Sequence, residues 1–211
     1  MGVDYSINSP AICIFRDNRY FWLSQPKPEK SKKGFAIQEQ VAELDEITLE
    51  FQPPVIDPES YSKNDVLKIS RYNFVAENFL SQLEFALGPD KSRIIDVGFE
   101  GYSFGSNSNN LIDIVSATTC FKTKFLSSVV NNMSMRVFAP STIKKHAGGG
   151  RLKKRELFDV FVENRLQDEN LEKTDVWKFC QNLQLGQKVP KPLDDLIDAY
   201  FTVNCLRKIE I

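Results

Sequence analysis

The order of periodic segments is the feature that most restricts the fold of this chain. Three short runs rich in β-branched and aromatic residues come first, at 2–7, 10–15 and 19–24. The turn residues Asp17 and Asn18 separate the second run from the third. Runs of this kind, joined by short turns, predict an antiparallel meander of three strands.

The remainder of the chain alternates helical and strand patterns. Apolar residues recur at helical spacing over 62–87, and the run at 93–100 is typical of a buried strand that ends at Glu100. Further elements are predicted in the order helix 111–128, strand 135–140, helix 151–166, weaker helix 174–184 and final helix 193–209. This order predicts an α/β fold with a mixed five-stranded sheet, the meander extended by two parallel strands, flanked by helices.

Length and composition favour a single domain. The 211 residues contain 42% hydrophobic and 26% charged residues, which is enough to bury a core. The stretch 25–60 holds five prolines, so it is predicted as an excursion outside the core with one strand near 46–51. We expect one domain over 1–211, with an insertion at about 25–60 and an extra helical segment at about 167–192.

Residue usage excludes several classes of protein. The single histidine, His146, excludes histidine-clustered metal sites, so any metal must be held mainly by carboxylates. The four cysteines are scattered without a CxxC pair, which is typical of reduced intracellular thiols. No apolar run reaches the ~18 residues of a membrane helix, and the first residues lack the basic flank and apolar region that are typical of a signal peptide. The expectation is a cytoplasmic protein with no membrane partner.

Positive charge is concentrated in one segment, although the net charge is only −1. Residues 141–155 carry six positive charges and no negative one. The charged residues are Lys144, Lys145, Arg151, Lys153, Lys154 and Arg155. A glycine triplet at 148–150 favours an open loop with exposed backbone N–H groups, in which basic side chains can approach a polyanion. A solvated surface loop is the alternative.

Acidic residues stand where a core element does not require them. Asp4 lies in the first strand, Glu100 ends a later strand, and Asp195 and Asp198 share one face of the final helix. Clustered carboxylates repel one another unless a cation such as Mg²⁺ neutralises them. Each acid also has a purely structural explanation. Asp4 could be an edge-strand residue, and Glu100 a charge at a loop boundary. Asp195 and Asp198 could be stabilised by the helix dipole in the first turn.

Four motifs in order carry a resemblance to a known family. They are G-V-D-Y-S at 2–6, D-V-G-F-E-G-Y-S-F-G at 96–105, P-S-T-I-K-K at 140–145 followed by G-R-L-K-K at 150–154, and D-L-I-D-A at 195–199. Together the four motifs span nearly the whole chain. Their order resembles that of the RuvC-like Holliday junction resolvases of the RNase H-like superfamily, and most of all that of the tailed-phage branch. The chain departs from the family at Ser6, where a glycine is usual.

The resemblance implies a Mg²⁺-dependent endonuclease that resolves branched DNA in recombination, repair or phage genome processing, in the host cytoplasm if it is phage-encoded. It implies that Asp4, Glu100, Asp195 and Asp198 hold two Mg²⁺ ions, with Mn²⁺ able to substitute, and that the protein is a homodimer. The implied DNA-binding residues are Lys144 or Lys145, Lys153 or Lys154, Arg151, and the aromatic residues Tyr102 and Phe104, which would stack on bases.

Two further interpretations stay open at this point. One is another RNase H-like nuclease, acting on RNA–DNA hybrids, flaps or ends; the other is a module that binds DNA structures without cutting them. An actin-like ATPase also opens with a Gly-x-Asp strand, but it needs about two such lobes, and 211 residues are too few.

Overall fold

A computed structural model describes residues 1–53, 61–88, 95–101, 108–128, 133–183 and 188–209. The strands are β1 (Gly2–Asp4), β2 (Ala11–Arg16), β3 (Arg19–Ser24), β4 (Ile47–Leu49), β5 (Ile95–Glu100) and β6 (Met133–Phe138). The helices are α1 (Lys32–Ala42), α2 (Tyr61–Leu87), α3 (Ser108–Ser128), α4 (Pro140–His146), α5 (Lys154–Val162), α6 (Asp175–Asn182) and α7 (Leu193–Ile209).

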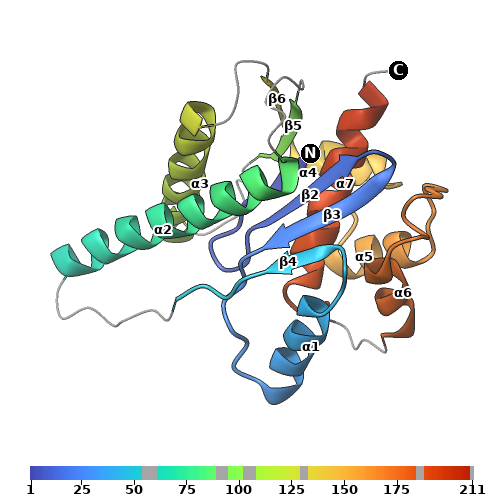
Figure 1. Cartoon of the computed structure of the whole chain (residues 1–211), viewed down its shortest axis with the longest axis horizontal. Coiled ribbons are helices and arrows are strands. Elements are labelled where there is room, and N and C mark those ends of the chain that lie inside the picture. Colours follow the sequence, from blue (N-terminus) through green and yellow to red (C-terminus); the bar gives the residue numbers. More distant parts are fainter. Residues whose placement is uncertain (54–60, 89–94, 102–107, 129–132, 184–187, 210–211) are drawn as a thin grey trace.

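The strands form one mixed sheet in the order β4-β3-β2-β1-β5-β6 (Figure 1). The predicted meander is confirmed, because β2 pairs antiparallel with both β1 and β3. The predicted parallel extension is confirmed too, since β5 lies parallel to β1 and to β6. The described residues form six strands, one more than the five expected. The sixth strand is β4, which pairs parallel with β3, and Trp22 stands opposite Ile47.

The described part of the predicted insertion, residues 25–53, contributes to the core, which the sequence pattern did not predict. The side chain of Ser31 accepts a hydrogen bond from the N–H of Gly34 and so caps the first turn of α1. Ile37 and Val41 of this helix are buried. Prolines lie near both ends of the segment and favour a loop in a sequence-based prediction. The sequence therefore predicts only the strand near 46–51 and not the helix α1.

The other predicted helices are all present, although α5 covers only part of the predicted range 151–166, and one helix is added. The final helix has the predicted bounds, and the helix predicted at 62–87 begins one residue earlier, at Tyr61. The addition is α4, which begins at Pro140, where a proline suits the first turn of a helix. Because α4 starts there, β6 ends two residues before the predicted end of its strand.

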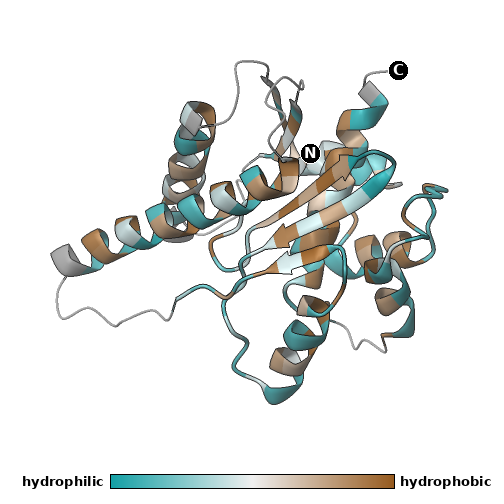
Figure 2. Cartoon of the chain, viewed as in Figure 1, coloured by the Kyte–Doolittle hydropathy of each residue, from teal (hydrophilic) through white to brown (hydrophobic). Residues whose placement is uncertain are grey.

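Two hydrophobic layers cover the two faces of the sheet. Helices α2 and α3 pack on one face, and α7 crosses the other face beside α4 and α5 (Figure 1). The strands alternate accordingly. On β2, Ile12 and Ile14 face the α2 layer, whereas Cys13 faces the α7 layer. Apolar residues line the central strands in Figure 2.

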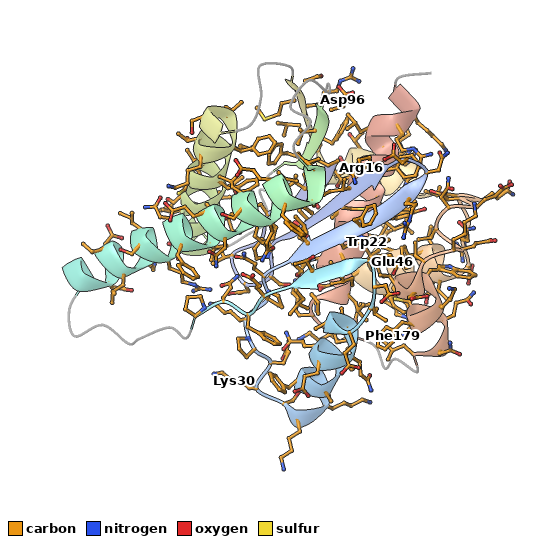
Figure 3. The ribbon with its side chains drawn as sticks, viewed as in Figure 1. Arg16, Trp22, Lys30, Glu46, Asp96 and Phe179 are labelled. Atoms are coloured by element: carbon orange, nitrogen blue, oxygen red, sulfur yellow. The ribbon has the colours of Figure 1, made fainter. Side chains whose placement is uncertain are left out.

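Hydrogen bonds fix the peripheral elements to this frame. The indole N–H of Trp22, labelled in Figure 3, donates to the carbonyl of Leu196 in α7 over 3.2 Å. Glu46, labelled beside α6, accepts hydrogen bonds of 3.1 Å from the N–H of Asp175 at the start of that helix. Among the described residues, no helix combines the length and the hydropathy that crossing a bilayer demands.

Candidate metal centre and nucleic-acid interface

Asp4 and Glu100 are brought together by the pairing of their strands. In the parallel ladder between β1 and β5, Gly2 stands opposite Gly98 and Val3 opposite Phe99. The same register continued by one residue sets Asp4 beside Glu100, at the carboxyl ends of the two strands. Ligand sites in sheets with parallel strands commonly lie at this edge.

Two glycines let α7 approach the strands that carry these acids. Side chains alternate along a strand, so Asp4 points to the same face as Gly2, and Glu100 to the same face as Gly98. A Cβ at Gly2 would overlap the backbone of Ala199 and Val203, and one at Gly98 would come within 3.2 Å of the Thr202 methyl group. The face toward which both acids point is therefore the one covered by α7.

Helix α7 completes a cluster of carboxylates. One oxygen atom from each of Asp4, Glu100 and Asp198 can be chosen so that all three atoms lie within 4.8 Å of one another. Asp198 is buried, and the other two are partly buried. Asp195 lies one turn before Asp198, is 1% exposed, and is not part of this set of three, although its charge acts on Asp4.

Two lysines supply positive charge to the cluster. The ammonium group of Lys154, at the start of α5, binds the carboxylate of Asp198 and lies 3.9 Å from Asp195 Oδ1. The ammonium group of Lys191, just before α7, binds the carboxylate of Asp195 and lies 3.1 Å from Asp194 Oδ2. Burial alone would lower the pKa of both lysines, but the surrounding carboxylates outweigh it and raise it.

The carboxyl groups are destabilised in their ionised form by burial and by their proximity. Burial, and then the charges of Asp198 and Asp195, raise the pKa of Glu100 to about 7, although Lys154 and Lys144 oppose the shift. Burial and the neighbouring Asp194 raise the pKa of Asp195 to about 6. The pKa of Asp4 is raised well above its ordinary value by burial and by Glu100.

The chemistry of this donor set suits a hard divalent cation. Mg²⁺ and Mn²⁺ are bound by carboxylate oxygens, and the three converging oxygens come from two strands and a helix of the fold. A cation there would also relieve the repulsion that raises the carboxyl pKa values. The cluster therefore fits a divalent metal centre made of carboxylates.

The basic segment lies on the two short helices beside the cluster. Lys144 and Lys145 lie in the last turn of α4, Lys153 is the N-cap residue of α5, and Lys154 follows it. Lys145, Arg151 and Lys153 are exposed at the surface, whereas Lys154 contacts the carboxylates. The charge of Lys144 acts on Glu100. Lys144 and Lys154 therefore act on the carboxylates, and which lysine of each pair contacts DNA stays a prediction.

The glycine triplet does not form the open loop that the sequence favoured. The N–H of Gly148 donates to the carbonyl of Lys145 over 3.2 Å, and the N–H of Gly149 to that of Lys144 over 3.0 Å. Gly148 has a φ of 123°, which a glycine adopts readily. The segment is a hydrogen-bonded turn that joins α4 to α5, so its N–H groups at 148 and 149 are already used.

The structure does not test two of the predicted residues, and it adds one residue that the sequence did not predict for the site. Tyr102 and Phe104, the predicted stacking residues, lie outside the described residues. Lys191 was not singled out as a site residue. The signal was present, because a lysine four residues before Asp195 is placed to pair with it at the start of a helix.

Comparisons with known proteins concern the fold. Neither a family model nor a curated protein matches the sequence. Among solved structures, Thermus thermophilus RuvC aligns over 99% of this chain and 95% of its own, with a TM-score of 0.52 and 12% identity. T. thermophilus RuvC in complex with a Holliday junction substrate aligns over 99% of this chain and 93% of its own, with a TM-score of 0.49 and 10% identity. The shared fold is the RNase H-like fold, which confirms the fold class predicted from the sequence.

Proposed function

We propose that this chain, which shares its fold with T. thermophilus RuvC, is a Mg²⁺-dependent, structure-selective endonuclease that resolves four-way DNA junctions. The observation that carries the proposal is the convergence of Asp4, Glu100 and Asp198 from three elements of that fold. A divalent cation would stabilise three converging carboxylates, and carboxylate oxygens are the donors that bind the metal in nucleases that use divalent ions. A tailed-phage origin stays a prediction.

We assign a different role to each group of residues in the site. Asp4, Glu100 and Asp198 would hold the metal, with Asp195 beside them. A divalent ion held by these residues would supply an activated water and would neutralise the charge that develops on the phosphodiester. Asp195 accepts a hydrogen bond from the ammonium group of Lys191 and so keeps this lysine beside the first turn of α7. The half-exposed Lys154 is placed to move between Asp198 and a phosphate oxygen.

A homodimer would provide the two active sites that symmetric cleavage of a junction requires. Helices α2 and α3 pack together and present exposed apolar side chains to solvent. Those of the first half of α2 and the start of α3 are Val66, Leu67, Ile69, Phe74 and Ile112. Monomeric proteins rarely expose several large apolar side chains in one region, so this is the surface we propose for the contact between protomers.

A cleavage assay on a synthetic four-way junction tests the proposal. Two strands of the same polarity are labelled in the junction, and Mg²⁺ or Mn²⁺ starts the reaction. We expect paired, symmetric nicks in the junction, with linear duplex left intact. Cleavage of RNA–DNA hybrids or flaps with no cutting of the junction would favour another RNase H-like nuclease, and binding without cutting would favour a DNA-structure-binding module.

The raised carboxyl pKa values predict how metal stabilisation depends on pH. The ordinary pKa of a glutamate is 4.5, and that of Glu100 is raised to about 7. Between these values the unfolded chain has lost a proton that the folded protein keeps, so this group makes the protein less stable as the pH rises. Mg²⁺ binds the ionised carboxylates, and we expect it to raise the melting temperature more at pH 8 than at pH 5.5, as measured by calorimetry.

Two comparisons make this measurement specific. The Glu100→Gln variant should lose part of the difference between the two pH values, because glutamine does not titrate whereas the raised carboxyl groups of Asp4 and Asp195 still do. The control is Asp45, an exposed acid just before β4, which β3 and β2 separate from β1, and Asp45→Asn should keep the difference. An equal Mg²⁺ shift at both pH values in the wild-type protein would contradict the prediction.

Removing charge from the basic segment should weaken DNA binding in a salt-dependent way. The change is Lys145→Gln with Lys153→Gln, two lysines that are not among the clustered carboxylates' ion-pair partners. Removal of one phosphate contact should reduce the slope of log affinity against log salt by about 0.9 for duplex DNA. Fluorescence anisotropy with a labelled junction at several salt concentrations measures it, and an unchanged slope would favour the alternative of a solvated surface.

A further inference from the structure

A pocket separate from the basic segment opens beside the carboxylate cluster. It has a volume of about 430 Å³ and lies between the loop that follows β1, the first half of α2, the start of α3 and Lys191. Four basic residues line it, and Asp113 is the one acidic residue among the described residues that line it. The basic residues are Lys27, Lys68, Arg71 and Lys191. The pocket therefore has a clear excess of positive charge.

Two of these cations have acidic partners among the described residues, and two do not. Lys68 binds both carboxylate oxygens of Asp113, at 3.0 and 2.9 Å, and Lys191 binds Asp195. Arg71 instead donates to neutral acceptors, the carbonyl oxygen of Ile7 at 3.4 Å and the side-chain oxygen of Gln52. In the part of the chain that the structure describes, neither Arg71 nor Lys27 forms a salt bridge.

Lys27 and Arg71 also act on one another. Both are partly buried, and burial lowers the pKa of each. The charge of Arg71 lowers the pKa of Lys27 further. Two half-buried cations that repel each other are stabilised when an anion lies between them. The guanidinium group of arginine suits phosphate in particular, because its N–H groups can donate in pairs.

The position of the pocket indicates which phosphate it would take. The lining loop at 6–8 begins two residues after Asp4, and Lys191 lines the pocket while it also binds Asp195. A DNA strand carries one phosphate per nucleotide, so a strand with one phosphate at the carboxylates places another close by. We infer that the pocket binds a backbone phosphate of the DNA strand that enters the carboxylate site, with Lys27 and Arg71 as its ligands. The inference rests on the proposed nuclease function.

Binding measurements in Ca²⁺ test the pocket without relying on cleavage. Junction affinity is measured at several salt concentrations for the wild-type protein and for the Lys27→Gln/Arg71→Gln variant. We expect about tenfold weaker binding at low salt, since hydrogen bonds to charged groups are the strong ones. We also expect a salt slope reduced by about 0.7 to 0.9, the value for one phosphate. The matched control is Lys33→Gln with Arg19→Gln, two exposed residues away from the pocket.

Two further variants separate charge from folding. Arg71→Lys keeps the charge but loses the paired N–H donation and changes the contact with Gln52, so it should keep the wild-type salt slope while it binds more weakly than the wild-type protein. Lys27→Gln alone removes an ammonium group that forms no salt bridge within the described residues, and its melting temperature should match that of the wild-type protein. If Lys27→Gln folds normally and binds DNA with wild-type affinity and slope, the pocket proposal is overturned.

Two measurements distinguish a DNA phosphate from a free phosphate ion as the ligand of the pocket. One uses DNA with a neutral backbone linkage, and the other uses inorganic phosphate. One methylphosphonate placed next to the scissile position should weaken binding by the wild-type protein but not by the double variant. Inorganic phosphate at constant ionic strength should compete with DNA more strongly in the wild-type protein. Phosphate binding in the pocket without any effect of the double variant on DNA binding would identify a small-anion site and contradict the proposal.

The outcomes also separate the pocket from the proposed function. A wild-type protein that cuts junctions, with a double variant that binds them normally, contradicts the pocket and leaves the nuclease in place. A wild-type protein that cuts nothing but loses DNA affinity in the double variant supports the pocket and contradicts the nuclease. A wild-type protein that does not bind DNA contradicts both.

Discussion

The Asp4→Asn variant loses junction cleavage by at least about a hundredfold and keeps its affinity for the junction: this is the largest effect we expect. Removing a group that only supports a metal ligand typically costs about 10- to 100-fold, and Asp4 is itself one of the three converging carboxylates. Asparagine has nearly the same shape but lacks the charge, so the sheet should be unaffected. Single-turnover cleavage in Mg²⁺ and junction binding in Ca²⁺ measure the two properties separately.

The control for this variant is a carboxylate of the same type away from the site. Asp45 precedes β4, so Asp45→Asn removes one negative charge without touching the cluster. It should cleave at the wild-type rate. Full cleavage by Asp4→Asn would remove Asp4 from the metal centre and, with it, the main support for the nuclease. Equal loss in both variants would point to an effect of net charge.

The second large effect is on stability, in the Gly2→Ala variant. A Cβ at position 2 would overlap the backbone of α7 at Ala199 and Val203, and a backbone cannot yield as a flexible side chain does. Overpacking of this kind costs about 3 kcal/mol of unfolding free energy. Because α7 carries Asp195 and Asp198, displacing it should also reduce cleavage by the molecules that remain folded. Urea denaturation and cleavage at matched folded protein concentration measure the two effects.

Gly149→Ala provides the matched control. A Cβ at Gly149 would make ordinary contacts with Leu152, at 3.6 and 3.7 Å, so its effect on unfolding should stay within about 0.5 kcal/mol. If both variants lose the same stability, the close packing of β1 on α7 is not what position 2 contributes. If Gly2→Ala is stable but inactive, the helix has moved at little energetic expense.

The order of strands and helices was predictable because it rests on local periodicity. The meander, the long α2 and the final helix all have strong patterns of apolar residues. Helix α1 was missed because prolines surround it, although Ser31 is a good N-cap residue and marks its start. The pairing of β4 with β3 depends on tertiary contacts that a three-residue strand does not encode.

The acidic residues of the site could be located for a related reason. Asp4 and Glu100 end strands, and Asp195 and Asp198 share a helix face, so each stands out against its own element. The cations could not be located in this way. Lys27, Arg71 and Lys191 come from a loop, a helix and a second loop, and their meeting point depends on how these elements pack. A local sequence pattern identifies an acidic residue in an apolar element. It does not identify a lysine or arginine whose role depends on which other residues the fold brings close to it.

The hydrogen bond from Trp22 to α7 gives the protein a built-in optical probe. The chain has two tryptophans, and the indole of Trp22 is fully buried, with its N–H bound to the carbonyl of Leu196 next to Asp195. A shift of the first turn of α7 would therefore alter the fluorescence of this indole. With Trp177 replaced by Phe, the emission of the remaining tryptophan would follow ion binding and strand entry in real time, without any attached dye.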